Sequence, residues 1–116
     1  MEDSVKKAII RDVLIFAIAL TVAVIFWKNN LLLTFLIISI YLIRQYFWSI
    51  KGDNVVFVTG TALGCAAEFI GTFLGVWTYA EPFFLNIPLW LPFAWGLVSV
   101  IIIRVSHPFI DTDNLL

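Results

Sequence analysis

Charged residues are scarce in this 116-residue chain: 13% of its residues are charged and 62% are hydrophobic. A soluble domain has about 25% charged residues. The net charge of −1 argues against the basic surface of a nucleic-acid-binding protein. The composition therefore predicts an integral membrane protein of one domain, with membrane lipids rather than nucleic acid as its surroundings.

Metal-ligating side chains are scarce too. The chain has one cysteine, Cys65, and one histidine, His107. A single cysteine cannot form a disulfide within the chain, and neither residue has the neighbours of a Cys or His metal site. Internal repeats are lacking as well, which argues against an inverted-repeat transporter within one chain. We expect no metal site and no cofactor.

Four apolar stretches are long enough to cross a bilayer, since a membrane helix needs about 20 mostly apolar residues. They cover residues 8–27, 31–48, 55–79 and 87–104. A signal peptide at the N-terminus is disfavoured, because the first stretch has no small-residue cleavage site. The sequence predicts an all-α fold in which residues 1–116 form a single transmembrane domain of four helices in one bundle. The acidic tail, 111–116, is expected to be disordered.

Basic residues predict the orientation. With four spans both termini lie on one side, and the positive-inside rule assigns the side richer in Lys and Arg to the cytoplasm. Lys28 lies on the other side. The side of the termini carries Lys6, Lys7, Arg11, Arg44, Lys51 and Arg104. Both termini are therefore predicted to be cytoplasmic, in a bacterial or archaeal plasma membrane.

One carboxyl group, Glu68, lies one residue from the midpoint of the stretch 55–79. A charge at the centre of a membrane helix costs about 2.5–3.5 kcal/mol, so it usually faces a bundle interior or a cavity. Four glycines fall with it inside an arc of about 80° on a helical wheel, which predicts a helix-packing face. They are Gly60, Gly64, Gly71 and Gly75.

Other polar and aromatic residues are expected around Glu68. Trp95, Thr21 and Ser39 lie near the midpoints of the other spans, and the Trp95 indole is expected to donate to Glu68. Tyr79 is expected about 16 Å further out on the same helix face. An outward-facing cleft is predicted above Glu68, lined by Trp77, Tyr79, Glu81 and Trp90. The alternative is a carboxyl group that serves packing alone, beneath an ordinary interfacial aromatic belt.

The segment from Glu68 to Pro82 reads EFIGTFLGVWTYAEP, and Ile-Pro-Leu follows at residues 87–89. It resembles a signature of uncharacterised bacterial integral membrane proteins, with Glu, then Gly-x-Trp-x-Tyr-Pro-Glu, then Val-Pro-Leu. It is more loosely similar to carotenoid biosynthesis membrane proteins of the carotenoid hydratase type. The likeness covers about residues 60–104, and Ala80 replaces the family proline. Both families are about twice as long as this chain.

Residues 67–72 are also similar to an Ala-Glu-x-Ile-Gly-Thr string of small multidrug transporters, which have four spans and an essential membrane Glu. Their Glu lies in the first span, whereas Glu68 lies in the third. We interpret this string as a coincidence.

These patterns favour a homo-oligomeric membrane protein whose Glu68 site binds a hydrophobic small molecule, such as an isoprenoid or carotenoid-like lipid. In an enzymatic version Glu68 acts as a general acid towards a double bond, and the aromatic faces stabilise positive charge. One alternative is a proton-coupled exporter of lipophilic cations. The other is a structural subunit of a membrane complex.

The orientation is tested by single cysteines placed at either terminus in a Cys65→Ser background. We expect a membrane-impermeant maleimide to label these cysteines only after the cells are permeabilised. A cysteine at Asn29, in the opposite turn, is the control and should react in intact cells. Labelling of the termini in intact cells would contradict the cytoplasmic assignment.

Overall fold

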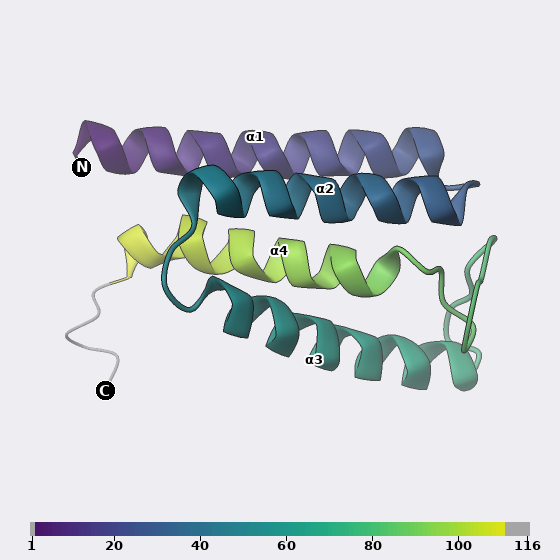
Figure 1. Ribbon diagram of the computed structural model, residues 1–116. Helices are drawn as coiled ribbons and strands as arrows, with labels where there is room; N and C mark the ends of the chain where they lie inside the picture. Colours follow the sequence, from purple (N-terminus) through teal and green to yellow (C-terminus); the bar gives the residue numbers. More distant parts are fainter. Residues whose placement is uncertain (1, 111–116) are drawn as a thin grey trace.

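The structure, a computed structural model, describes residues 2–110 and consists of four helices followed by a short 3₁₀ turn (Figure 1). Met1 and the acidic tail, 111–116, lie outside the described residues, and so does the disorder expected of that tail. All four helices are long and apolar enough to cross a membrane. The elements are α1 (Asp3–Phe26), α2 (Asn30–Trp48), α3 (Asp53–Phe73), α4 (Leu91–Ser106) and η1 (His107–Phe109).

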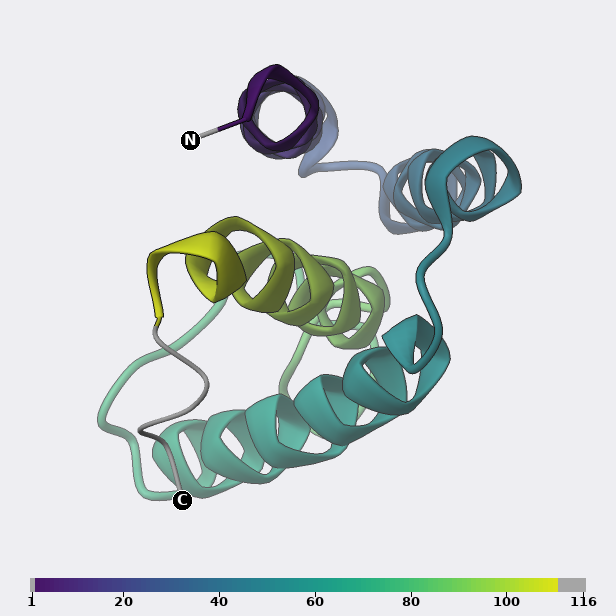
Figure 2. The ribbon, with the colours of Figure 1, turned by 90° about the vertical axis from the view of Figure 1, so that its left-hand side faces the viewer.

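Helix α4 is the centre of the bundle and contacts each of the other three helices. Seen end-on, it lies between α1 and α3, with α2 to one side (Figure 2). The apolar core forms where α1, α2 and α4 meet. Its buried members are Ala19, Leu33, Ile37, Tyr41, Leu97, Val100 and Ile101. Helix α3 packs on the other side of α4, away from this core.

Glycines let α3 and α4 approach each other closely. A Cβ atom at Gly64 would overlap the Trp95 ring, and one at Gly60 would overlap the Ser99 side chain. The packing is reciprocal, since a Cβ atom at Gly96 of α4 would lie 2.7 Å from the Phe57 ring of α3. The glycine face predicted from the wheel therefore packs within the chain at these positions.

The third helix ends six residues before the predicted end, and Gly75 is the reason. Gly75 has φ +75°, a left-handed conformation that glycine adopts without steric cost. The Val76 amide donates to the Gly71 carbonyl at 2.9 Å, and the Gly75 amide donates to the Thr72 carbonyl at 3.2 Å. These two bonds make a Schellman motif, with Gly75 just past the helix end. The assignment of Gly75 to a helical packing face was therefore wrong, and no atom of residues 2–110 lies within 4 Å of the position that a Cβ atom would take.

A folded loop, residues 74–90, replaces the end of the third predicted span and the start of the fourth. Helix α4 begins at Leu91 rather than at residue 87, with Pro92 in its first turn, where a missing N–H leaves no bond unmade. The Asn30 side chain holds the loop against the start of α2. It donates to the Glu81 carbonyl at 3.0 Å and accepts from the Leu89 amide at 3.1 Å.

Arg44 joins the four helices at the end of the bundle where both described chain ends lie (Figure 1). Its side chain is fully buried. It donates twice to Asp12 of α1, at 2.9 and 3.1 Å, and once to Asp53 of α3, at 3.0 Å. Arg104 of α4 donates to the other Asp53 oxygen at 2.6 Å. The sequence pattern predicted these arginines as markers of orientation, and it missed their partners.

Asp53→Asn is expected to destabilise the bundle strongly. The substitution keeps the shape of the side chain but removes the charge that faces Arg44 and Arg104, and breaking a buried pair typically costs about 3–5 kcal/mol. Thermal unfolding in detergent measures the effect. Asp3→Asn, at an exposed acid of α1, is the matched control and should change stability little. Equal unfolding temperatures for the two variants would show that the cluster does not hold the helices together.

Candidate functional site

Glu68 is the buried carboxyl group of the apolar part of the bundle, and its residue is 7% exposed. The sequence predicted Glu68 at the midpoint of its helix, and that prediction was wrong. Because α3 runs from Asp53 to Phe73, Glu68 lies five residues from the helix end, or about 7.5 Å. Trp95 is likewise close to the start of α4. The site therefore lies near the end of the bundle opposite the Arg44 cluster.

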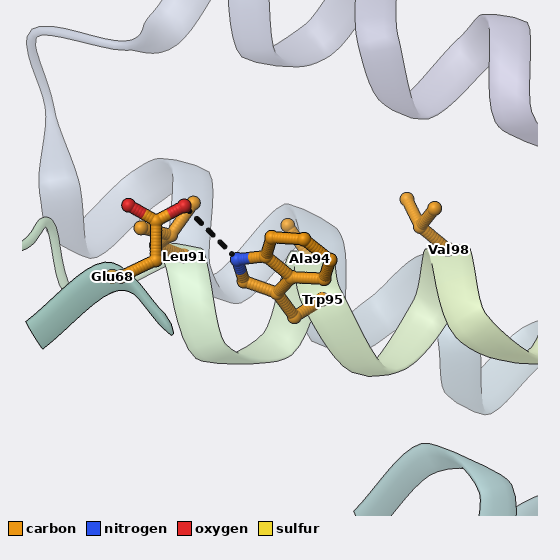
Figure 3. Close-up of a pocket in the computed structure, with 5 residues that line it drawn as sticks. All are labelled: Glu68, Leu91, Ala94, Trp95 and Val98. Atoms are coloured by element: carbon orange, nitrogen blue, oxygen red, sulfur yellow. Dashed lines mark hydrogen bonds between the residues drawn. The ribbon is translucent and has the colours of Figure 1, made fainter. Parts of the chain in front are cut away.

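Three aromatic side chains donate hydrogen bonds to Glu68. The Trp77 indole lies 2.8 Å from Oε2, and the Tyr79 hydroxyl lies 2.6 Å from the same oxygen. The Trp95 indole lies 3.3 Å from Oε1, which is the contact expected from the sequence (Figure 3). No Lys or Arg among residues 2–110 pairs with Glu68. The carboxyl group is thus held by neutral donors alone.

The positions predicted for Trp77 and Tyr79 were wrong. Both were expected to line a cleft above Glu68 on a longer helix, with Tyr79 about 16 Å further out than the carboxyl group. Because the chain reverses at Gly75, both side chains return to the carboxyl group. Gly71 makes the return possible, since a Cβ atom there would overlap the Trp77 ring. The helix break, not the helix face, brings these donors to Glu68.

Tyr79 remains a neutral hydrogen-bond donor in this arrangement. Burial raises the pKa of its hydroxyl, and the hydrogen bond to Glu68 and the nearby carboxylate charge raise that pKa further. A phenol with a raised pKa keeps its proton at neutral pH. Its 2.6 Å bond to Glu68 is therefore a donation from Tyr79.

An apolar cavity of about 210 Å³ opens beside the carboxyl group. It lies between Glu68 on α3 and one face of α4, as Figure 3 shows. The lining residues of α4 are Leu91, Ala94, Trp95 and Val98. Their spacing of three and four residues is that of a single helix face, a signal present in the sequence. Only Trp95 of this face was predicted as a site residue.

Thr21 and Ser39 do not belong to the site, although they were predicted in a polar layer with Glu68. The Thr21 hydroxyl donates to the Ala17 carbonyl at 2.8 Å, and the Ser39 hydroxyl donates to the Phe35 carbonyl at 2.7 Å. Each hydroxyl therefore donates its hydrogen bond to a backbone carbonyl in the preceding turn of its own helix. Thr21 and Ser39 were placed with Glu68 because all three lie near the midpoints of their predicted spans, but residues at the same depth need not be in contact.

Glu81 and Trp90 are also separate from the carboxyl group. Glu81 is exposed on the loop, and its backbone carbonyl binds Asn30. Trp90 lines a second cavity of about 110 Å³. Its Nε1 atom is buried and has no hydrogen-bond partner among the described residues. That cavity shares Ala94 and Val98 with the cavity beside Glu68. The predicted outward cleft is therefore replaced by two adjoining apolar cavities along α4.

Within residues 2–110 no group of three or more His, Cys, Asp or Glu side chains is placed to hold a metal ion. Comparisons with protein-family models, with curated proteins and with solved structures found no match for this chain.

Gly71→Leu is expected to destabilise the protein more than Ala66→Leu. The added side chain at Gly71 displaces the Trp77 ring, whereas Ala66 is exposed on the opposite part of the helix. Overpacking of a tight contact typically costs about 1–3 kcal/mol. Thermal unfolding of both variants in detergent measures the difference. Equal stability would mean that the close approach of Trp77 to Gly71 contributes nothing.

Proposed function

We propose that this chain is an integral membrane protein whose Glu68 site binds a hydrophobic small molecule of the isoprenoid or carotenoid-like lipid class. The observation that carries the proposal is a buried carboxyl group, held by three aromatic donors, on the wall of an apolar cavity. Ligand sites are mostly apolar with a few placed polar groups. An ionisable side chain inside a membrane protein is functional by default.

The hydrogen-bond inventory of Glu68 supports a ligand with a donor group. A carboxylate offers about four acceptor positions. Oε2 accepts from Trp77 and Tyr79, while Oε1 accepts from Trp95 alone. One position on Oε1 is therefore left for a hydroxyl group of the ligand.

Trp90 supports a ligand with an acceptor as well. A buried polar group without a partner is uncommon, because losing its hydrogen bond costs about 1–3 kcal/mol. The Trp90 Nε1 group is such a donor, and other atoms of Trp90 line the cavity that shares Ala94 and Val98 with the cavity beside Glu68. A ligand oxygen would satisfy it. Each cavity is smaller than the about 300 Å³ of a typical ligand pocket, which suits a segment of a longer chain.

Binding is better supported than general-acid catalysis. Trp77, Tyr79 and Trp95 direct their N–H and O–H groups at the carboxyl oxygens, so the site has the form of an acceptor held in place. A general acid needs its own proton directed at the substrate. We therefore propose a binding role and leave the enzymatic version as a lesser alternative.

Export of a lipophilic cation is the second candidate function. It is favoured by one observation: no cationic side chain of residues 2–110 neutralises Glu68. An ammonium group seated on Oε1 would pair with the carboxylate and contact the Trp95 ring.

We propose that both termini are cytoplasmic, because the arginines gather at their end of the bundle.

Homo-oligomerisation is also proposed. The support is α1, which leaves large apolar side chains such as Ile10, Leu14 and Ile18 exposed along its length. A second copy or lipid would cover them.

Glu68→Gln is expected to lower the retention of the co-purified hydrophobic molecule about tenfold, the effect of losing one charge-assisted hydrogen bond. Mass spectrometry of molecules extracted from the purified protein measures the loss. Glu81→Gln removes an exposed carboxyl group at the same end of the bundle and is the matched control.

The class of molecule lost from Glu68→Gln decides between the candidates. A neutral isoprenoid-type molecule supports the proposal, and a lipophilic cation supports the exporter instead. Identical extracts from the natural protein and both variants, all equally stable to heat, would contradict a binding role for Glu68.

A further inference from the structure

A cavity of about 360 Å³ lies at the opposite end of the bundle from Glu68, between the first turns of α1 and the end of α4. We call it the basic cavity, after its cationic lining residues Arg11 and Arg104 and the neighbouring His107. Asp12, which is paired with Arg11 and Arg44, also lines the cavity. The remaining wall is Ser4 and the apolar residues Val5, Ala8, Ile9, Ile50 and Pro108. The basic cavity plays no part in the proposed function of Glu68.

Both arginines are held in place by groups other than a ligand. Arg11 donates to Asp12 through Nε, at 3.4 Å, and Nη2, at 3.2 Å, and lies over the Trp48 ring, 5.1 Å from its centre. Arg104 donates through Nε to Asp53 and through Nη2 to the Lys51 carbonyl at 3.2 Å. Neither Nη1 group donates to a residue between 2 and 110. Each guanidinium is thus oriented and keeps its Nη1 group as an unused, charged donor.

The charge at this end favours an anion. Asp12 and Asp53 are shared among three arginines, because Arg44 binds both of them. The acids are therefore already paired, and the cluster of five side chains keeps a positive charge. A negatively charged group in the basic cavity would balance it.

The basic cavity lies at headgroup depth if the helices cross a bilayer. Helix α1 has 24 residues and is about 36 Å long, which exceeds the about 30 Å of a hydrocarbon core. The excess of about 6 Å places the first turn of α1 among the headgroups. Arg11 lies about 6 Å deeper, a depth from which a long side chain can reach back to the headgroups. A second apolar cavity of about 400 Å³ lies along the next turns of α1 and α4. Its lining residues Val13 and Ser106 are the sequence neighbours of Asp12 and His107, which line the basic cavity. A phosphate in the basic cavity would place its acyl chain along this groove.

We propose that the basic cavity is a binding site for the phosphate headgroup of an anionic membrane lipid. Arg11 and Arg104 donate to the phosphate oxygens, and the groove beginning at Val13 takes the adjoining acyl chain. Basic pockets between membrane helices bind such headgroups in general. Free phosphate carries the same anionic group as the lipid headgroup and could bind the same arginines. The apolar cavity beginning at Val13 favours the lipid, because only the lipid has an acyl chain to fill it.

The test uses the full chain purified in a neutral detergent and titrated, by native mass spectrometry, with phosphatidylglycerol, phosphatidylcholine or inorganic phosphate. Phosphatidylglycerol is expected to bind most tightly. Arg11→Gln should weaken it about tenfold, because one charge-assisted interaction is lost. Lys28→Gln removes one positive charge at the far end and should leave the affinity unchanged. His107 also lines the basic cavity, so His107→Ala, at an exposed side chain, removes a further N–H donor and should give a smaller loss if Arg11→Gln does not fold.

Three outcomes would overturn the assignment. Equal affinity for phosphatidylglycerol and phosphatidylcholine would exclude an anion-selective headgroup site. Inorganic phosphate that binds as tightly as phosphatidylglycerol would identify a site for free phosphate instead. Equal losses in Arg11→Gln and Lys28→Gln would show that only the overall charge of the protein matters. None of these outcomes bears on Glu68, whose ligand is measured separately.

Discussion

A single buried guanidinium, that of Arg44, connects the helices of this bundle. It binds Asp12 of α1 and Asp53 of α3, and Asp53 in turn binds Arg104 of α4. Charges this deeply buried are stable only when each is paired and hydrogen-bonded. The cluster therefore fixes which helices are neighbours and how far each is displaced along its axis. Glycine contacts between α3 and α4 then set the spacing on the side where Glu68 lies.

The sequence predicted the four helices because apolar length is a strong and local signal. Residues 31–48 were predicted and α2 runs from Asn30 to Trp48, whereas residues 55–79 were predicted for a helix that ends at Phe73. That error has one cause, since Gly75 was counted on a helix face although its φ is positive. A stretch can be apolar enough to cross a membrane and still contain a loop. Hydropathy does not distinguish a continuous helix from a helix followed by an apolar loop. In this chain the left-handed conformation of Gly75 makes that difference.

The candidate site was predictable in its centre and not in its surroundings. Glu68 and Trp95 were found because an acid within an apolar span is rare, and so is a tryptophan near the midpoint of a span rather than at its end. Thr21 and Ser39 were placed with them by depth alone, and depth says nothing about which helix faces which. The ion pairs of Arg44 with Asp12 and Asp53 were missed, although the antiparallel order of the helices puts these residues at one level. Pairing acids with bases of equal depth would have found the cluster.

The order of these acids and bases along the chain matters for how the protein enters a bilayer. Asp12 and Arg44 belong to the first helical hairpin, and Asp53 and Arg104 belong to the second. Each hairpin therefore carries its own acid and base, so one of the buried ion pairs can form as soon as its second helix is made. An unpaired charge in a nascent membrane helix costs about 2.5–3.5 kcal/mol. If the helices cross a bilayer, an ion pair formed within each hairpin lowers that cost, and the Arg44–Asp53 bond then joins the finished hairpins to each other.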